Sequence, residues 1–109
     1  MTEVHAPCTL TFDDQTLDFI ASWFRVLGEP YRLRIVHVLR RGAMTVGELA
    51  QSLNGNQSNV SRHLQLLHRA GMIDRKRHGI NIVYSLHNSS VTRLCEMVHQ
   101  NELRKAEIR

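Results

Sequence analysis

Short hydrogen-bonding side chains and cations crowd one segment in the middle of the chain, residues 56–69. If this segment is a helix, at about 100° per residue, Val60, Leu64 and Leu67 form one apolar face. The opposite face then carries small polar groups and guanidinium groups, with no bulky residue to hold it away from a partner surface. The residues of this segment that we expect to contact a ligand are Asn56, Gln57, Ser58, Asn59, Ser61, Arg62, His63, Gln65 and Arg69.

These side-chain types match the chemistry of a nucleic-acid groove. A major groove about 12 Å wide admits a helix, and its base edges are read by Arg at guanine, by Gln or Asn at adenine and by Ser at either. Backbone amides in the first turn of such a helix can also bind a phosphate group. The polar face therefore predicts direct contact with double-stranded DNA.

A second basic cluster follows in the sequence DRKRHG, residues 74–79. We expect it at or near the tip of a β-hairpin, where cations reach the backbone or the minor groove of an adjacent DNA turn. A charged tip that is merely solvated is the alternative, but the neighbouring polar helix favours DNA. The residues of this second cluster are Arg75, Lys76, Arg77 and His78.

Hydrophobic periodicity predicts the elements that position these two clusters. Apolar residues recur at helical spacing in five segments, which we expect to form helices near residues 13–27, 30–41, 46–53, 57–69 and 89–107. Between the fourth and fifth helices the period changes to two, which predicts a β-hairpin over residues 72–86. The expected fold is mainly α with a small β-hairpin, a winged helix-turn-helix in the order α-α-α-α-β-β-α.

Residues at the expected helix ends support these boundaries. Pro30 suits the first position of the second helix, and Gly42 lies just past its end. Thr45 and Glu48 have the spacing of a capping box, and Asn56 can cap the helix that follows it. The local signals therefore agree with the periodicity.

Charge is distributed unevenly along the chain. Residues 31–86 carry nine Lys or Arg against two acids, whereas residues 1–30 carry one Arg against five acids. A basic segment of this strength suggests a polyanion, with nucleic acid first and an acidic membrane surface second. An evenly soluble surface would scatter the charge more widely.

Length and composition indicate one domain. We expect a flexible arm at residues 1–11 and a single winged helix domain over residues 12–109. No apolar run approaches the ~20 residues of a membrane span, and no signal peptide is expected. Cys8 and Cys95 are far apart and lack C-x-x-C spacing, so the sequence favours a reducing cytoplasm.

The motifs LGEPYRLRIVHVL, TVGELAQSL, QSNVSRHLQLLHRAGMI and GINIVYSL together resemble the ArsR family of winged-helix repressors, from about Leu27 to Leu86. The resemblance implies a homodimer formed by the first and last helices and bound to an inverted-repeat operator. It also implies repression that an inducer relieves. The apolar stripes of both helices agree with a dimer, because a domain this small could hardly bury them alone. The expected interface residues are Leu17, Ile20, Trp23, Phe24, Val91, Leu94, Cys95 and Val98.

The chain departs from the sensing sites of the family that it resembles. Metal-sensing relatives carry a Cys-x-Cys pair where this chain reads MTVGELA, and sulfur-sensing relatives carry a Cys where it has His37. Another group binds zinc through Asp, His, His and Glu on the last helix. The residues at those four positions here are poor ligands for a first-row metal: Asn88, Ser90, Asn101 and Arg104.

Two sets of residues remain as candidates for sensing. Cys8 and Cys95 could form a redox pair or bind a soft ion such as As(III), Hg(II) or Cu(I). Alternatively, His5 and Cys8 in the arm could join Cys95 and His99 in a tetrahedral Zn site. The simpler interpretation is that Cys95 packs as a small hydrophobic residue in the last helix, with no sensing role.

Three classes of function are distinguished by these features. A sequence-specific DNA-binding repressor, released by a metal, a metalloid or a thiol-reactive species, explains both basic clusters; a repressor without metal or redox sensing would explain them too. A winged helix used only for protein–protein contact would expose a more apolar surface. The sequence shows no nucleophile, base and acid arrangement, so we do not expect an enzyme.

Overall fold

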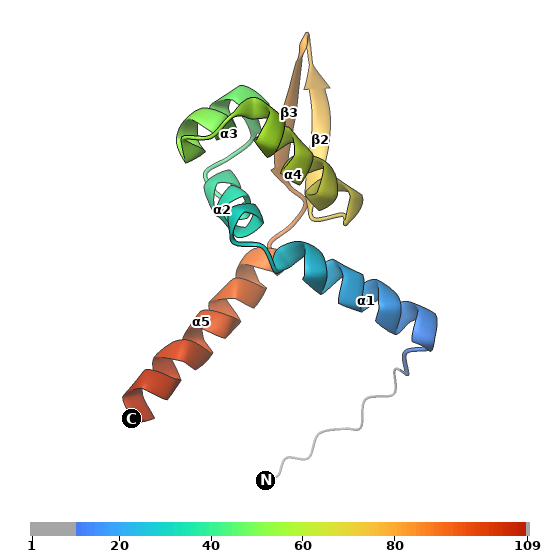
Figure 1. Ribbon diagram of the computed structural model, residues 1–109, viewed down its shortest axis with the longest axis vertical. Coiled ribbons are helices and arrows are strands. Elements are labelled where there is room, and N and C mark those ends of the chain that lie inside the picture. The colour runs from blue at the N-terminus through green and yellow to red at the C-terminus, as the bar shows by residue number, and fades with distance from the viewer. Residues whose placement is uncertain (1–10, 109) are drawn as a thin grey trace.

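Five helices and a small antiparallel sheet make up the computed structural model, which describes residues 11–108 (Figure 1). The elements, in chain order, are α1 (Asp14–Leu27), α2 (Pro30–Leu39), β1 (Met44–Thr45), α3 (Val46–Leu53), α4 (Gln57–Arg69), β2 (Ile73–His78), β3 (Asn81–Leu86) and α5 (Ser90–Ile108). The predicted fold class is confirmed, with all five helices and the hairpin in the expected order. The expected arm lies almost entirely outside the described residues.

Side-chain caps fix where the helices begin. The Thr45 hydroxyl accepts from the Glu48 amide at 3.1 Å, and the Glu48 carboxylate accepts from the Thr45 amide at 2.9 Å. The Asn56 side chain accepts from the Asn59 amide at 2.8 Å, and Pro30 occupies the start of α2. These contacts satisfy amides that have no partner inside a helix, so the capping box and the Asn56 cap are confirmed.

The core joins α2, α3 and α4 to the base of the sheet. Val60, Leu64 and Leu67 on α4 are fully buried, as the helical wheel predicts. They pack in one cluster with Ile35 of α2 and Leu49 of α3. Burying the apolar face of α4 in this way leaves its polar face as the outer surface of the molecule.

The sheet has three strands in the order β1-β3-β2, one more than the sequence predicts. Strand β1 contains only two residues, with Met44 opposite Tyr84 and Thr45 opposite Val83. Two residues are too few for a period of two to be recognised. In the hairpin turn Gly79 has φ of 61°, which fits the first central position of a type II′ turn.

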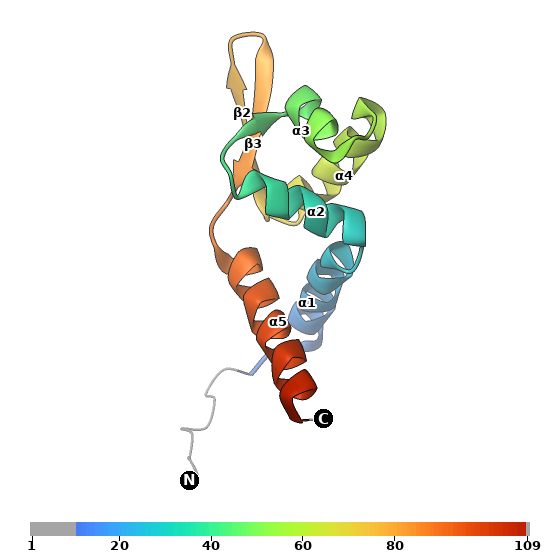
Figure 2. The same ribbon diagram turned by 90° about the vertical axis from the view of Figure 1, so that its left-hand side faces the viewer.

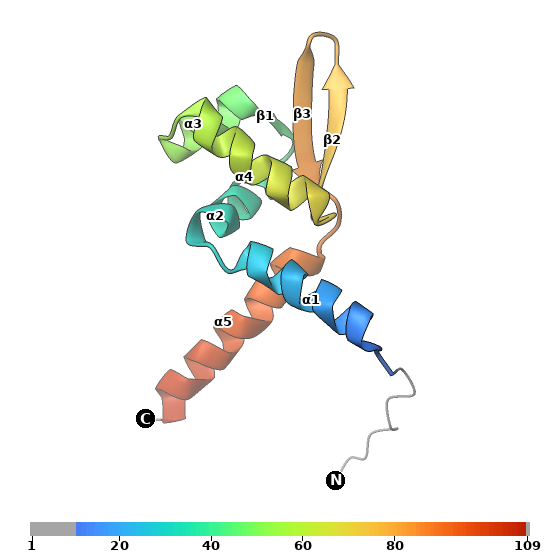
Figure 3. The same ribbon diagram turned by 45° about the vertical axis from the view of Figure 1, so that its right-hand side comes forward.

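Helices α1 and α5 lead away from this body on the side opposite the hairpin tip (Figures 1 and 3). Between them and α2 lies a groove of about 590 Å³ with a mostly apolar lining. Phe24 on α1 and Val98 on α5 line it and are 50% and 61% exposed. Val91, expected on this surface, is instead buried in the core, because the first turn of α5 packs against the body.

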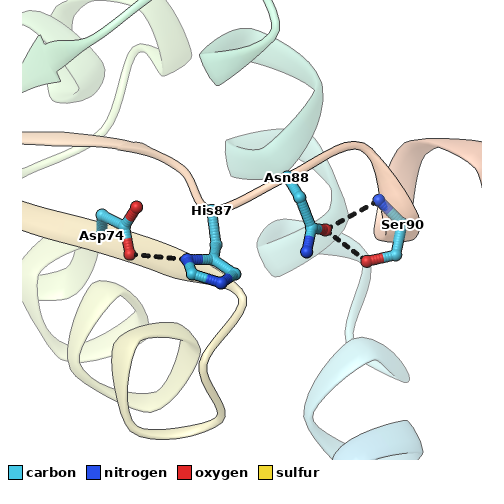
Figure 4. Close-up of polar contacts among 4 residues, drawn as sticks. All are labelled: Asp74, His87, Asn88 and Ser90. Atoms are coloured by element: carbon cyan, nitrogen blue, oxygen red, sulfur yellow. Dashed lines mark hydrogen bonds and ion pairs between the residues drawn. The ribbon is translucent and has the colours of Figure 1, made fainter.

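Short polar contacts lie where β3 leads into α5 (Figure 4). The His87 Nδ1 and the Asp74 carboxylate are 2.9 Å apart, and the Asn88 side chain accepts from the Ser90 amide at 2.9 Å. Asn88 therefore caps the start of α5.

Candidate nucleic-acid interface

The outer face of α4 is a polar surface on a rigid support. Gln57, Ser58, Arg62, Gln65 and Arg69 are exposed, while the opposite side of the same helix is buried. A shallow concavity of about 520 Å³ runs along this face, beside the start of α3. Because the helix is anchored by its core residues, the polar groups keep fixed positions relative to one another.

Asn59 on α4 and Asn56 just before it both make structural contacts; the sequence predicts the cap at Asn56 but not the contact of Asn59. The Asn59 side-chain oxygen accepts from Arg62 Nη2 at 2.7 Å, which holds the guanidinium group in place on the exposed face. The Asn56 side-chain oxygen is occupied by the cap of α4. Both are also expected to contact DNA, which stays a prediction; within the protein, Asn56 caps α4 and Asn59 holds Arg62.

His63 points away from the outer face. Its Nδ1 lies 3.2 Å from Arg32 Nη1 on α2, and its ring packs on the Tyr31 ring with centroids 5.1 Å apart. Partial burial, together with the positive charge of Arg32, lowers the pKa of His63 below its ordinary value of 6.5. The sequence groups His63 with the residues expected to contact DNA; its position against α2 depends on tertiary contacts that no local pattern records.

The basic residues of the hairpin divide between its two faces. Arg75 pairs with Tyr84 and Arg77 with Ile82, so these residues share one face of the sheet. That face looks toward α4, because Arg75 lines one concavity of about 470 Å³ together with Gln65 and Arg69. Lys76 and His78 lie on the opposite face, by the alternation of a strand.

The hairpin tip differs from expectation. Arg75 was expected at or near the tip, but it lies toward the base of β2, opposite Tyr84. The turn itself consists of Gly79 and Ile80, and Ile80 is 94% exposed. Sequence analysis did not single out Ile80, although apolar residues at such tips can enter a minor groove. The hairpin projects beyond α3 and α4 (Figures 2 and 3), which gives this tip its reach.

The candidate sensing residues are only partly described. Cys95 is exposed and lines a small cavity of about 210 Å³ between α2 and α5, together with His37 and His99. His5 and Cys8 lie outside the described residues. Within residues 11–108, no three His, Cys, Asp or Glu side chains are grouped so that they could hold a metal ion. The described residues alone therefore do not fit a zinc site.

Known proteins are similar to this chain in sequence and in fold. A family model described as a helix-turn-helix domain matches residues 27–76. The HTH-type transcriptional regulator NmtR of Mycobacterium tuberculosis is 36% identical over 91 residues, which cover 83% of this chain and 76% of the relative. The transcriptional repressor SdpR of Bacillus subtilis is 35% identical over 66 residues, covering 61% and 73%. The chain belongs to the ArsR family.

Solved structures agree with membership of the ArsR family. The crystal structure of M. tuberculosis Rv0081 has a TM-score of 0.77 at 28% identity and covers 89% of this chain and 98% of its own. The homodimeric winged helix-turn-helix domain of Mb0332 from Mycobacterium bovis, described as a possible ArsR-family regulator, has a TM-score of 0.74 at 26% identity, with 86% and 90% covered.

ArsR-family proteins are DNA-binding transcriptional regulators and are not enzymes, so these two predictions are confirmed. The family favours DNA binding over a module used only for protein contacts. No helix within residues 11–108 is long and apolar enough to cross a membrane.

Proposed function

We propose that the protein is a cytoplasmic, homodimeric repressor that binds an inverted-repeat DNA operator through α4 and the β2–β3 hairpin. One observation carries this proposal: the outer face of α4 and the arginine face of the hairpin border the same concavity, with Arg69 and Arg75 both in its lining. A helix and an adjacent cationic ribbon fit a major groove and the backbone or minor groove beside it. Repression requires only that the bound dimer blocks the promoter.

Each element has its own task at the operator. The exposed Arg62 is held by Asn59 and can donate two hydrogen bonds to a guanine edge. The first turn of α4, at Gln57 and Ser58, brings backbone amides to a phosphate. Arg77 and the hairpin tip contact the neighbouring stretch of duplex without reading its bases. We therefore assign specificity to α4 and general affinity to the hairpin.

In this proposal the dimer is formed by the exposed apolar residues of α1 and α5. Large apolar side chains are exposed there in one protomer, among them Leu17, Phe24, Val98 and Leu103. Apolar exposure on this scale, on two adjoining helices, is typical of a surface that a second copy covers. The domain of Mb0332, described as homodimeric, has the same fold. A dimer places two copies of α4 at two half-sites, which explains an inverted repeat.

A thiol-reactive species or a soft ion at Cys95 is the inducer that we propose, with Cys8 as a second thiol. Cys95 borders both the α2–α5 cavity and the apolar groove between α1 and α5. A group added to its sulfur would enter one of these spaces and change how α5 packs. Since α5 belongs to the proposed dimer surface, modification would alter the spacing of the two α4 helices and release the operator. A repressor without metal or redox sensing is the alternative.

Fluorescence anisotropy tests this proposal, on DNA that the protein selects from a random pool. We expect one inverted repeat to be selected and bound with an affinity that falls steeply as salt increases, through counterion release. We also expect alkylation of the thiols to weaken binding, and a Cys95→Ser variant to resist that loss. Selection of no sequence would contradict the repressor; equal affinity before and after alkylation would contradict only the inducer site.

A further inference from the structure

The start of α2 connects α1 to α4 through one side chain. Arg32 Nε donates to the carbonyl oxygen of Val26, near the end of α1. The last carbonyl groups of a helix have no partner within it, and a cation there also interacts favourably with the helix dipole. Arg32 therefore stabilises the end of α1 and is itself held in one orientation.

The same guanidinium group extends to the opposite side, toward α4. Arg32 Nη1 lies 3.2 Å from His63 Nδ1. A guanidinium group can only donate, so Nδ1 must be the accepting nitrogen and the ring proton of neutral His63 must be on Nε2. The contact thus requires the neutral imidazole, and only one of its two tautomers.

Tyr31 strengthens the connection from the neighbouring position. Its ring packs on the ring of His63, and its hydroxyl lies so close to Gly55 that a Cβ there would collide with it. Gly55 belongs to the turn that leads into α4. Consecutive residues of α2 therefore contact both α4 and the turn before it, while Arg32 also holds α1.

We propose that Arg32 and His63 form a proton-sensitive link that fixes α4 relative to α1, and that protonation of His63 reduces the protein's ability to distinguish its operator from other DNA. His63 is a positioning residue in this proposal, which rests on the proposed function. A protonated ring has no acceptor at Nδ1, and its charge lies directly beside the Arg32 cation. The link is then replaced by repulsion.

The surrounding charges determine the direction of the pH dependence. Partial burial and the Arg32 cation lower the pKa of His63; Glu29, at the cap of α2, opposes them, and Arg62 on α4 adds to the lowering. In the pH range between the lowered and the ordinary pKa, the folded chain binds fewer protons than the unfolded chain. The link is therefore present at neutral pH, and its contribution to folding stability is lost as the pH falls through that range.

The position of α1 affects DNA binding because α1 carries part of the proposed dimer surface. A link between α1 and α4 fixes the separation of the two recognition helices in a dimer. Acidic pH also makes a protein surface more positive in general, which strengthens binding to any DNA. The ratio of operator to non-operator affinity separates the two effects, since additional positive charge raises both affinities alike.

The first test measures this ratio for the full chain near pH 7.5 and near pH 5.5. Loss of one charge-assisted hydrogen bond corresponds to about a tenfold fall in the ratio for wild type. His63→Gln keeps an accepting oxygen and does not titrate, so its ratio should stay constant. The ratio for His68→Gln, a variant on the same helix, should fall as the ratio for wild type does. A constant ratio in wild type, or an equal fall in His63→Gln, would overturn the proposal.

A second test needs no DNA, so it separates this inference from the proposed function. NMR titration of the His63 ring should show the Nε2–H tautomer and a pKa that rises in Arg32→Met. Arg34→Met, an exposed cation on the same helix, should leave the pKa unchanged. An unchanged pKa in Arg32→Met would refute the link, whereas failure to bind any operator at pH 7.5 would refute only the proposed function.

Discussion

At the scale of single residues, the hairpin shows how the structure sharpens a prediction. The sequence groups four basic residues as one cluster, without assigning them to faces. The strand register separates them: Arg75 and Arg77 look toward α4, and Lys76 and His78 look away. Charge alone therefore does not determine which of these cations contacts DNA; its position relative to α4 does.

Arg77 and Lys76 provide a matched pair, since each carries one positive charge and they are adjacent in β2. We expect Arg77→Ala to weaken binding to all sequences alike and to reduce the salt slope by about one for each phosphate that is no longer neutralised. Lys76→Ala should have the smaller effect on both quantities. Anisotropy across a series of salt concentrations measures them. A larger loss of affinity in Lys76→Ala would show that the opposite face of the hairpin contacts DNA.

At the scale of elements, α4 depends on a cap and on its buried face. Sequence analysis predicted its cap, its bounds and its buried residues because these depend on local spacing. It did not predict β1, which is too short to show a period, or the inward position of His63, which depends on Arg32 31 residues away in the chain. It also did not predict the contact of Asn59 with Arg62, because an interaction between two exposed residues of one helix has no separate signature in the sequence.

Asn56 caps α4, so its replacement should act mainly on stability. Asn56→Ala should lower the free energy of unfolding by about 1 kcal/mol, because the Asn59 amide loses its acceptor. Asn56→Asp should retain stability, since a carboxylate accepts the same bond. It should still weaken DNA binding, because it places a negative charge beside a phosphate site. Urea denaturation and anisotropy measure the two effects; a stable Asn56→Ala variant would contradict the capping role.

Substitutions at Leu64 and Gln65 test the two faces of α4 separately. Leu64 is fully buried, so Leu64→Ala should cost about 2–5 kcal/mol of unfolding free energy. Gln65 is exposed, and Gln65→Ala should leave the unfolding free energy almost unchanged while weakening operator binding. The same urea and anisotropy measurements apply. A large stability loss in Gln65→Ala would mean that the outer face of α4 has a structural role.

At the scale of the whole molecule, the chain is elongated, with extents of 56 × 38 × 19 Å. Helix α4 and the hairpin, which we propose bind DNA, lie toward one end, and α1 and α5, with their exposed apolar residues, extend toward the other (Figure 3). This separation allows one surface to bind a second copy while the other remains free for DNA. Signals that act on α5 or α1 can therefore reach α4 through α2, the core and the strands of the sheet.

Phe24 tests the dimer surface because it is half exposed in the protomer. Phe24→Glu should leave the fold intact but convert the dimer to monomers, since burying an unpaired carboxylate at an interface is costly. Operator affinity should fall with it, because one half-site alone is bound weakly. Sedimentation velocity and circular dichroism distinguish dissociation from unfolding. A dimeric Phe24→Glu protein with normal affinity would place the interface elsewhere.

The central claim is that the outer face of α4, together with the hairpin, is the DNA-binding surface. The most direct measurement compares Arg62→Ala with Arg93→Ala on the selected operator and on a scrambled duplex. Both variants remove one exposed cation, but Arg93 lies on α5. Removing a bidentate hydrogen bond to guanine costs about 1–3 kcal/mol, so Arg62→Ala should lose roughly tenfold or more in operator affinity and in discrimination, with little change for Arg93→Ala. Equal losses of affinity in the two variants would contradict the claim.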